Sequence, residues 1–137
     1  MIALIKYKGD DPQKHTPLYF PRWTSMGTAT KTDLAKIMQR GSTFSVGEVE
    51  GIMTDFAQKI CDALLDGKTV DIQGLGKFTL KAKGKAQTNS HNVTTEDISL
   101  DVRFTPDPDL RLRLDTESEF QFVSKPSRAK EPEAGEP

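Results

Sequence analysis

The feature that most constrains this chain is a long apolar stripe at helical spacing that stops before Gly67. The stripe consists of Val46, Val49, Ile52, Met53, Phe56, Ile60, Ala63 and Leu64. Ser45 and Glu48 have the spacing of a capping box, in which each side chain bonds the other residue's backbone N–H. A glycine just past the last apolar position is typical of a helix end. The sequence therefore predicts a helix of about five to six turns.

A shorter helix is expected just before this stripe. Thr30 and Asp33 resemble a second capping box, and an acid in the first turn suits the positive end of a helix. Leu34, Ile37 and Met38 then recur at helical spacing. Residues 41–45, Gly-Ser-Thr-Phe-Ser, interrupt the pattern. We therefore expect two helices joined by a tight turn.

After Gly67 the period changes from helical to alternating. Residues 69–72 and 77–83 alternate between apolar and polar, with Gly74 and Gly76 in a turn between them, which indicates a β-hairpin. Residues 98–104 alternate again and should return to the same sheet. The polar segment between has at 94–97, Thr-Thr-Glu-Asp, the pattern of a cap for a short helical turn. The expected fold class is α+β, a helix pair with an antiparallel sheet.

Both ends of the chain carry additional elements. Residues 2–7 and 18–23 favour strands and could form a hairpin around a polar loop. Asp107 and Pro108 fit the start of a helix, while residues 110–114 fit a strand or a short helix equally well. Residues 120–123 indicate a last strand, and 124–137 lack core-forming residues. The predicted organisation is an N-terminal β extension (1–29), a central domain (30–123) and a disordered tail (124–137).

Composition excludes some classes of protein. No apolar run approaches the roughly 20 residues that span a bilayer, and the first residues lack a secretory apolar segment, so a cytoplasmic location is expected. The formal net charge of −1 excludes a generic polycation. Cys61 lies within the helical pattern and is expected to be a small buried apolar residue.

No set of residues indicates catalysis, a cofactor or a metal. The Gly-Lys-Thr at 67–69 lacks the earlier glycine of a P-loop, and Gly74-x-Gly76 lacks the third glycine and the following helix of a dinucleotide loop. His15 and His91 have no neighbours at metal-ligand spacing, and no nucleophile–base pair is evident. The sequence therefore predicts a protein that is not an enzyme.

The strongest candidate site is a row of lysines along one predicted strand. Alternation places Phe78, Leu80 and Ala82 on one face and the lysines on the other, about 6–7 Å apart. The row comprises Lys77, Lys81, Lys83 and Lys85, with Arg103 and Asp101 of the returning strand sharing the face. Such a row can follow phosphates without reading sequence. The alternative is an ordinary solvated strand face, because lysines also protect sheets from aggregation.

Several motifs together resemble the HU/IHF family of bacterial histone-like proteins. The most specific is Gly-Leu-Gly-Lys-Phe at 74–78, which is similar to the family's Gly-Phe-Gly-x-Phe hairpin. The Thr-Lys-Thr-Asp-Leu at 30–34, the Gly-Lys-x-Val at 67–70 and the Val-Arg-Phe-Thr-Pro at 102–106 also match in order. Residues 1–29 resemble the extension of a divergent branch. The resemblance implies an intertwined homodimer with DNA across the sheet, and Phe56, Phe78 and Phe104 in the core or dimer interface.

The segment that would form the family's DNA-kinking arm departs from the pattern. Family arms carry many arginines and a tip proline that wedges between base pairs, whereas residues 84–97 contain neither residue type. We therefore expect a homodimer that binds double-stranded DNA at the nucleoid, without sequence preference, through Lys77, Lys81, Lys83, Lys85 and Arg103. The alternative is a structural or partner-binding module that keeps the fold and has lost strong DNA binding.

Overall fold

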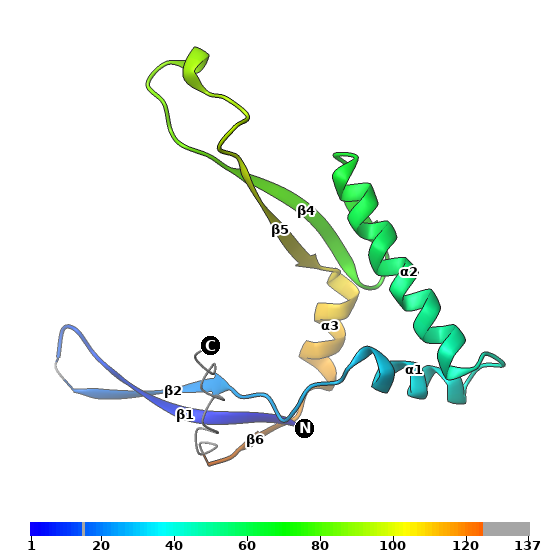
Figure 1. The fold of residues 1–137 in the computed structure, drawn as a ribbon. Coiled ribbons are helices and arrows are strands. Elements are labelled where there is room, and N and C mark those ends of the chain that lie inside the picture. The colour runs from blue at the N-terminus through cyan, green and yellow to red at the C-terminus, as the bar shows by residue number, and fades with distance from the viewer. Residues whose placement is uncertain (15, 125–137) are drawn as a thin grey trace, which may run out of the picture. The chain divides into compact units, whose positions relative to one another are not determined.

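The computed structural model describes residues 1–14 and 16–124, and it divides the chain into two units. One unit comprises residues 29–116, and the other comprises residues 1–28 together with the described residues from 117 onward. Figure 1 shows the elements of both units. Among these described residues, no helix is long and apolar enough to cross a bilayer. The predicted tail lies outside the described residues, except for Ser124.

The two predicted helices are present, and each begins at its predicted cap. Helix α1 spans Lys31–Arg40 and α2 spans Val46–Leu65. The Asp33 N–H donates to Thr30 Oγ1 at 3.2 Å, and the Thr30 N–H donates to Asp33 Oδ2 at 2.9 Å. Ser45 and Glu48 make the same reciprocal bonds, at 3.1 and 3.3 Å. These bonds satisfy N–H groups that a helix start otherwise leaves unpaired.

The helix pair buries little of its apolar surface. Within residues 29–116, all of which the structure describes, the buried apolar side chains are Ala35, Val49 and Leu64. Most of the predicted stripe stays partly exposed, including Ile52 and Phe56. Cys61 is also exposed, so its expected burial is wrong for a single chain. Lys31 Nζ donates to Thr54 Oγ1 at 2.7 Å and links α1 to α2.

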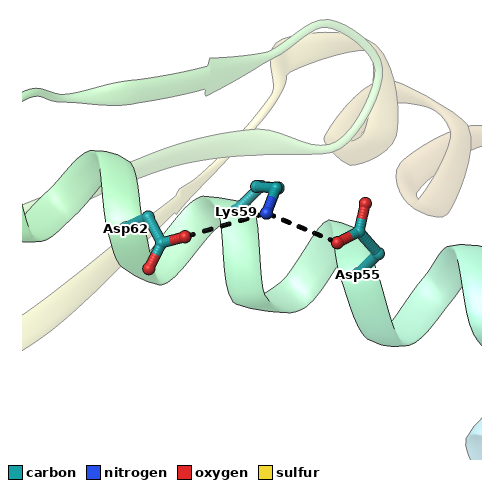
Figure 2. A network of polar contacts seen from close by, with 3 residues as sticks. All are labelled: Asp55, Lys59 and Asp62. Atoms are coloured by element: carbon teal, nitrogen blue, oxygen red, sulfur yellow. Dashed lines mark ion pairs between the residues drawn. The ribbon is translucent and has the colours of Figure 1, made fainter.

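The polar side of α2 carries a short network of ion pairs. Lys59 Nζ lies 3.5 Å from Asp55 Oδ1 and 4.0 Å from Asp62 Oδ2 (Figure 2). The spacings of four and three residues place all three side chains on one helix face. Because the groups are mostly exposed, each pair contributes only about 0.3–0.5 kcal/mol. This face of α2 is therefore a solvated surface, in contrast to the apolar stripe.

The predicted hairpin and returning strand form one antiparallel sheet in the order β3-β4-β5. Strand β3 spans Val70–Ile72, β4 spans Gly76–Lys83 and β5 spans Ser99–Pro106. Phe78 pairs with Phe104 across the ladder. Gly74 and Gly76 both have positive φ, of 86° and 154°, as the tight turn requires. Strand β5 continues two residues further than expected, because Thr105 and Pro106 still pair with the start of β4.

The excursion between β4 and β5 contains a helical turn, but not where the sequence predicts it. A 3-10 turn, η1, spans Ser90–Asn92, and the Asn89 side chain caps it by accepting from the His91 N–H at 3.1 Å. Residues 94–97 form no helix. The helix predicted after Thr94 is therefore absent, and the helical turn of this segment follows Asn89, whose side chain caps it.

Helix α3 spans Pro108–Glu117 and includes residues 110–114. The sequence pattern of these residues fits a strand or a short helix equally well. The Asp109 N–H donates to Asp107 Oδ1 at 2.9 Å, so Asp107 and Pro108 start the helix as predicted. The Asp107 N–H donates to the Leu75 carbonyl at 3.0 Å and ties the start of α3 to the β3–β4 turn.

The other unit is a second three-stranded sheet, in the order β2-β1-β6. Strands β1 (Ile2–Asp10) and β2 (Pro17–Trp23) pair antiparallel, and β6 (Phe120–Phe122) pairs parallel with β1 (Figure 1). The last strand is present, as predicted. Its partner is the N-terminal strand β1, however. The two units of the structure therefore differ from the predicted domains, whose boundaries are at 29 and 123.

Candidate nucleic-acid interface

The lysine row lies on the outer face of β4, as alternation requires. Lys77, Lys81 and Lys83 are exposed and occupy alternate positions along the strand. Phe78 and Leu80 occupy the positions between them and point to the opposite face. α2 contacts β3 and β4. The lysines therefore lie on one side of the strand, because the apolar residues alternate with them and occupy the other side.

The ladder brings Arg103 to this face but leaves Lys85 outside the sheet. Arg103 pairs with Thr79, which lies between Lys77 and Lys81 on the same side of β4. Strand β4 ends at Lys83, so Lys85 belongs to the excursion. There it lines a hollow of about 200 Å³ together with Lys83, Asn92 and Asp97. Four of the five predicted residues thus share one surface, which we call the cationic face: Lys77, Lys81, Lys83 and Arg103.

Two carboxylates also occupy the cationic face. Asp101 pairs with Lys81 across the ladder and forms an ion pair with Lys83. Asp71 of β3 pairs with Lys77. Four cations and two carboxylates leave this face with a net charge of +2. The sequence analysis does not place Asp71 on this face. The tight turn between residues 72 and 76 could have indicated it, because that turn sets the register that pairs Asp71 with Lys77.

The opposite face of the sheet is apolar and only partly covered. The Phe78 and Phe104 rings pack with centroids 5.0 Å apart, tilted by 47°. Leu100, Val102 and Phe104 of β5 nevertheless remain exposed. Apolar surface on this scale is uncommon on a stable monomer. The sheet therefore has one charged face and one apolar face.

No metal-binding group supports another kind of site. Within residues 1–14 and 16–124, no three His, Cys, Asp or Glu side chains come together in a way that could hold a metal ion. The chemistry available on the cationic face is that of ammonium and guanidinium donors, which bind phosphate oxygens through charge-assisted hydrogen bonds.

Comparison with known proteins shows which family and relatives this chain is similar to. Residues 3–121 match the family model described as an HU domain fused to a winged helix-turn-helix, immunoglobulin or glycine-rich motif. An integration host factor subunit alpha from Erythrobacter litoralis is 37% identical over 59 residues, 43% of this chain and 59% of that protein. An integration host factor subunit beta from a Shewanella species (strain ANA-3) is 30% identical over 91 residues, 63% of this chain and 95% of the relative.

Two solved structures share the fold. A protein from Bacteroides vulgatus described as a candidate bacterial DNA-binding protein superposes with a TM-score of 0.65 and 14% identity. That match covers 88% of this chain and 48% of the larger protein. HU from Anabaena, crystallised with DNA, superposes with a TM-score of 0.51 and 14% identity, covering 64% of this chain and 98% of HU. This chain therefore spans about half the length of the Bacteroides protein and 59% of the Erythrobacter relative.

Proposed function

Because the chain belongs to the HU/IHF family, we propose that it binds double-stranded DNA through the cationic face. The observation that carries the proposal is the convergence of Lys77, Lys81, Lys83 and Arg103 on one exposed sheet surface. Ammonium and guanidinium groups at strand spacing contact phosphate oxygens along a duplex. Contacts of this kind carry no base information, so the binding is independent of sequence.

The carboxylates on the cationic face weaken it but do not block it. The Lys83 and Asp101 side chains are each more than half exposed, and an ion pair of that kind contributes at most about 1 kcal/mol. A phosphate can therefore replace Asp101 as the partner of Lys83 at little cost. Lys85 lies beyond the end of β4 and is not part of the cationic face, so the proposal does not depend on it.

We also propose that the DNA-binding form is a homodimer. Residues 29–116 bury only three apolar side chains in one chain, while Phe56, Val102 and Phe104 are exposed. A second copy that covers the α2 stripe and the apolar face of β5 would complete the core and would double the number of cations. The relatives include subunits named alpha and beta, so pairing with a different chain is the alternative that a test of assembly must separate.

Phosphate contact alone is proposed, without insertion of a side chain between base pairs. Residues 84–97 contain no arginine and no proline, which are the residues that family arms use in the minor groove. The fold instead closes this segment with the polar turn η1. A cytoplasmic, nucleoid-associated role without catalysis follows from the proposed activity.

The salt dependence of duplex binding tests the proposal. Affinity should fall steeply between about 50 and 200 mM salt, because each contacted phosphate releases a counterion. The double variant Lys77→Gln, Lys81→Gln should bind more weakly, with a salt slope smaller by about 2. The control is Lys36→Gln with Lys59→Gln, which removes the same charge from the helices. No binding at the lowest salt, or equal losses for both double variants, would contradict the proposal.

One observation favours a second function, that of a partner-binding module that retains the fold. Asp71 and Asp101 halve the charge of the cationic face, and the whole chain has a net charge of −1. A surface of mixed charge suits a folded protein partner better than it suits a duplex. This function would be supported by an intact dimer that shows no duplex binding in the same titration.

A further inference from the structure

The β2-β1-β6 sheet has two faces of different character. The register places Leu4 beside Trp23 and Phe122, Lys6 beside Pro21, and Lys8 beside Tyr19, all on one face. We call this surface the aromatic face: Lys6, Lys8, Tyr19, Trp23, Phe120 and Phe122. The other face carries Tyr7, Phe20 and Arg22. Nothing in the proposed duplex binding uses either face.

The aromatic face is the more exposed of the two, although Tyr7 and Phe20 on the other face are still 42% and 49% exposed. Phe20 lies across Gly9, where an added Cβ would come within 3.2 Å of the ring, and the Arg22 guanidinium lies 5.2 Å from the centre of the Tyr7 ring. On the aromatic face, Tyr19 is 65% exposed, Trp23 67%, Phe120 61% and Phe122 54%. Four large rings in water on one small sheet mark a binding surface.

Positive charge is interleaved with these rings. Lys6 Nζ lies 5.1 Å from the centre of the Phe122 ring, and Lys8 pairs with Tyr19 across the ladder. A hollow of about 360 Å³ adjoins Lys6 and Phe122 and is also lined by Ile5, Val123 and Ser124. The surface therefore offers flat apolar rings and ammonium groups side by side.

We infer that the aromatic face binds single-stranded nucleic acid by stacking unpaired bases on its rings. Every base has a π-face and is linked to a phosphate, so a surface of exposed rings with cations between them matches both parts of the ligand. A second copy of this chain fits less well, because pairing two such faces would bury Lys6 and Lys8 of each copy against like charges. Duplex DNA also fits poorly, since its bases are already stacked.

Trp23 provides a direct readout, because it is the only tryptophan of the chain. Titrating the full chain with a thymidine homopolymer should quench Trp23 fluorescence as bases stack on it. Tyr19→Ala should weaken this binding by about 10-fold. The matched control is Tyr7→Ala, which removes the only other tyrosine, from the opposite face of the same sheet, and should leave the affinity unchanged.

Further variants separate this inference from the proposed duplex binding. Lys77→Gln with Lys81→Gln should lose duplex affinity and keep the quenching by the single strand. Lys8→Gln, an exposed change that leaves the rings in place, should weaken single-strand binding and lower its salt dependence. Unchanged Trp23 emission, or equal losses for Tyr19→Ala and Tyr7→Ala, would overturn the inference. So would an oligomer in the free protein that Tyr19→Ala dissociates, since a second copy would then occupy the face.

Discussion

Gly76 lies where β4 begins and pairs with both neighbouring strands. Its φ is 154°, a Cβ added to it would collide with the Thr105 carbonyl oxygen, and the Phe104 ring lies 2.7 Å from the same point. We expect Gly76→Ala to lower the free energy of unfolding by more than about 1 kcal/mol, through backbone strain and the clash. Denaturant unfolding measures this loss.

Gly74→Ala is the matched control for this prediction. Gly74 also has a positive φ, of 86°, but a Cβ there would meet open space. It should therefore cost only the strain of the backbone, about 1 kcal/mol, and less than Gly76→Ala. Equal losses at the two positions would show that contact with β5 contributes nothing to the requirement for glycine.

Asp33 links the stability of α1 to pH. The Thr30 backbone N–H donates to its carboxylate, and this bond, with a contribution from the Thr30 side chain, lowers the pKa of Asp33 below its ordinary value of 3.8. A carboxyl whose pKa is lower in the folded state stabilises the fold above 3.8 and loses that contribution as the pH falls.

Asp33→Asn should therefore be less stable than the wild type near pH 6, with the difference shrinking toward about pH 2. Unfolding free energies measured across this range give the test. A difference that stays constant with pH would contradict a role for the charged form of Asp33.

At the scale of elements, α2 depends on the cap at its first turn. Ser45 Oγ accepts from the Glu48 N–H at 3.1 Å, and no other side chain of the capping box can replace that bond. Ser45→Ala should lower the free energy of unfolding by about 1 kcal/mol. Ser45→Asp is the control, because aspartate caps as well as serine, and it should restore most of the stability. Equal stability of Ser45→Ala and the wild type would argue against the cap.

The helices and the central sheet could be predicted because their signals are local. Thr30 with Asp33, and Ser45 with Glu48, fix the starts of α1 and α2 within a single turn. Gly74 and Gly76 fix the hairpin in the same way. The partner of β6 could not be predicted, because a strand of three residues has no informative period. Its pairing with β1 joins segments more than 110 residues apart.

Only the part of the cationic face that lies on β4 could be predicted from the sequence. Alternation alone places Lys77, Lys81 and Lys83 on one side, because a pleated strand has a fixed period. Where β4 ends depends on its pairing with β5, and for that reason Lys85 was wrongly included in the strand. Asp71 and Asp101 come to the same face through cross-strand register, which depends on turn geometry rather than on composition.

At the scale of the whole molecule, the chain separates two sheets with different surfaces. One sheet lies within residues 29–116 and carries the cationic face, and the other joins both ends of the chain through β1 and β6. The first presents cations, and the second presents rings and lysines together. The two proposals thus assign paired and unpaired nucleic acid to separate units, and variants in one unit should leave the other's binding intact.

Assembly is the property that decides whether residues 29–116 form a complete core. Phe56 is 48% exposed and lies in the middle of the α2 stripe, so Phe56→Glu would place a charge in the proposed dimer interface. Gln58→Glu adds the same charge about 200° around the helix and serves as the control.

Sedimentation equilibrium should give twice the chain mass of 15.2 kDa for the wild type and Gln58→Glu. Phe56→Glu should give the mass of one chain, because burying an unpaired carboxylate in the interface costs several kcal/mol. Its melting temperature should then be independent of protein concentration. A wild-type protein that sediments as a single chain at every concentration, and still melts cooperatively, would contradict the homodimer and point to a different chain as the partner.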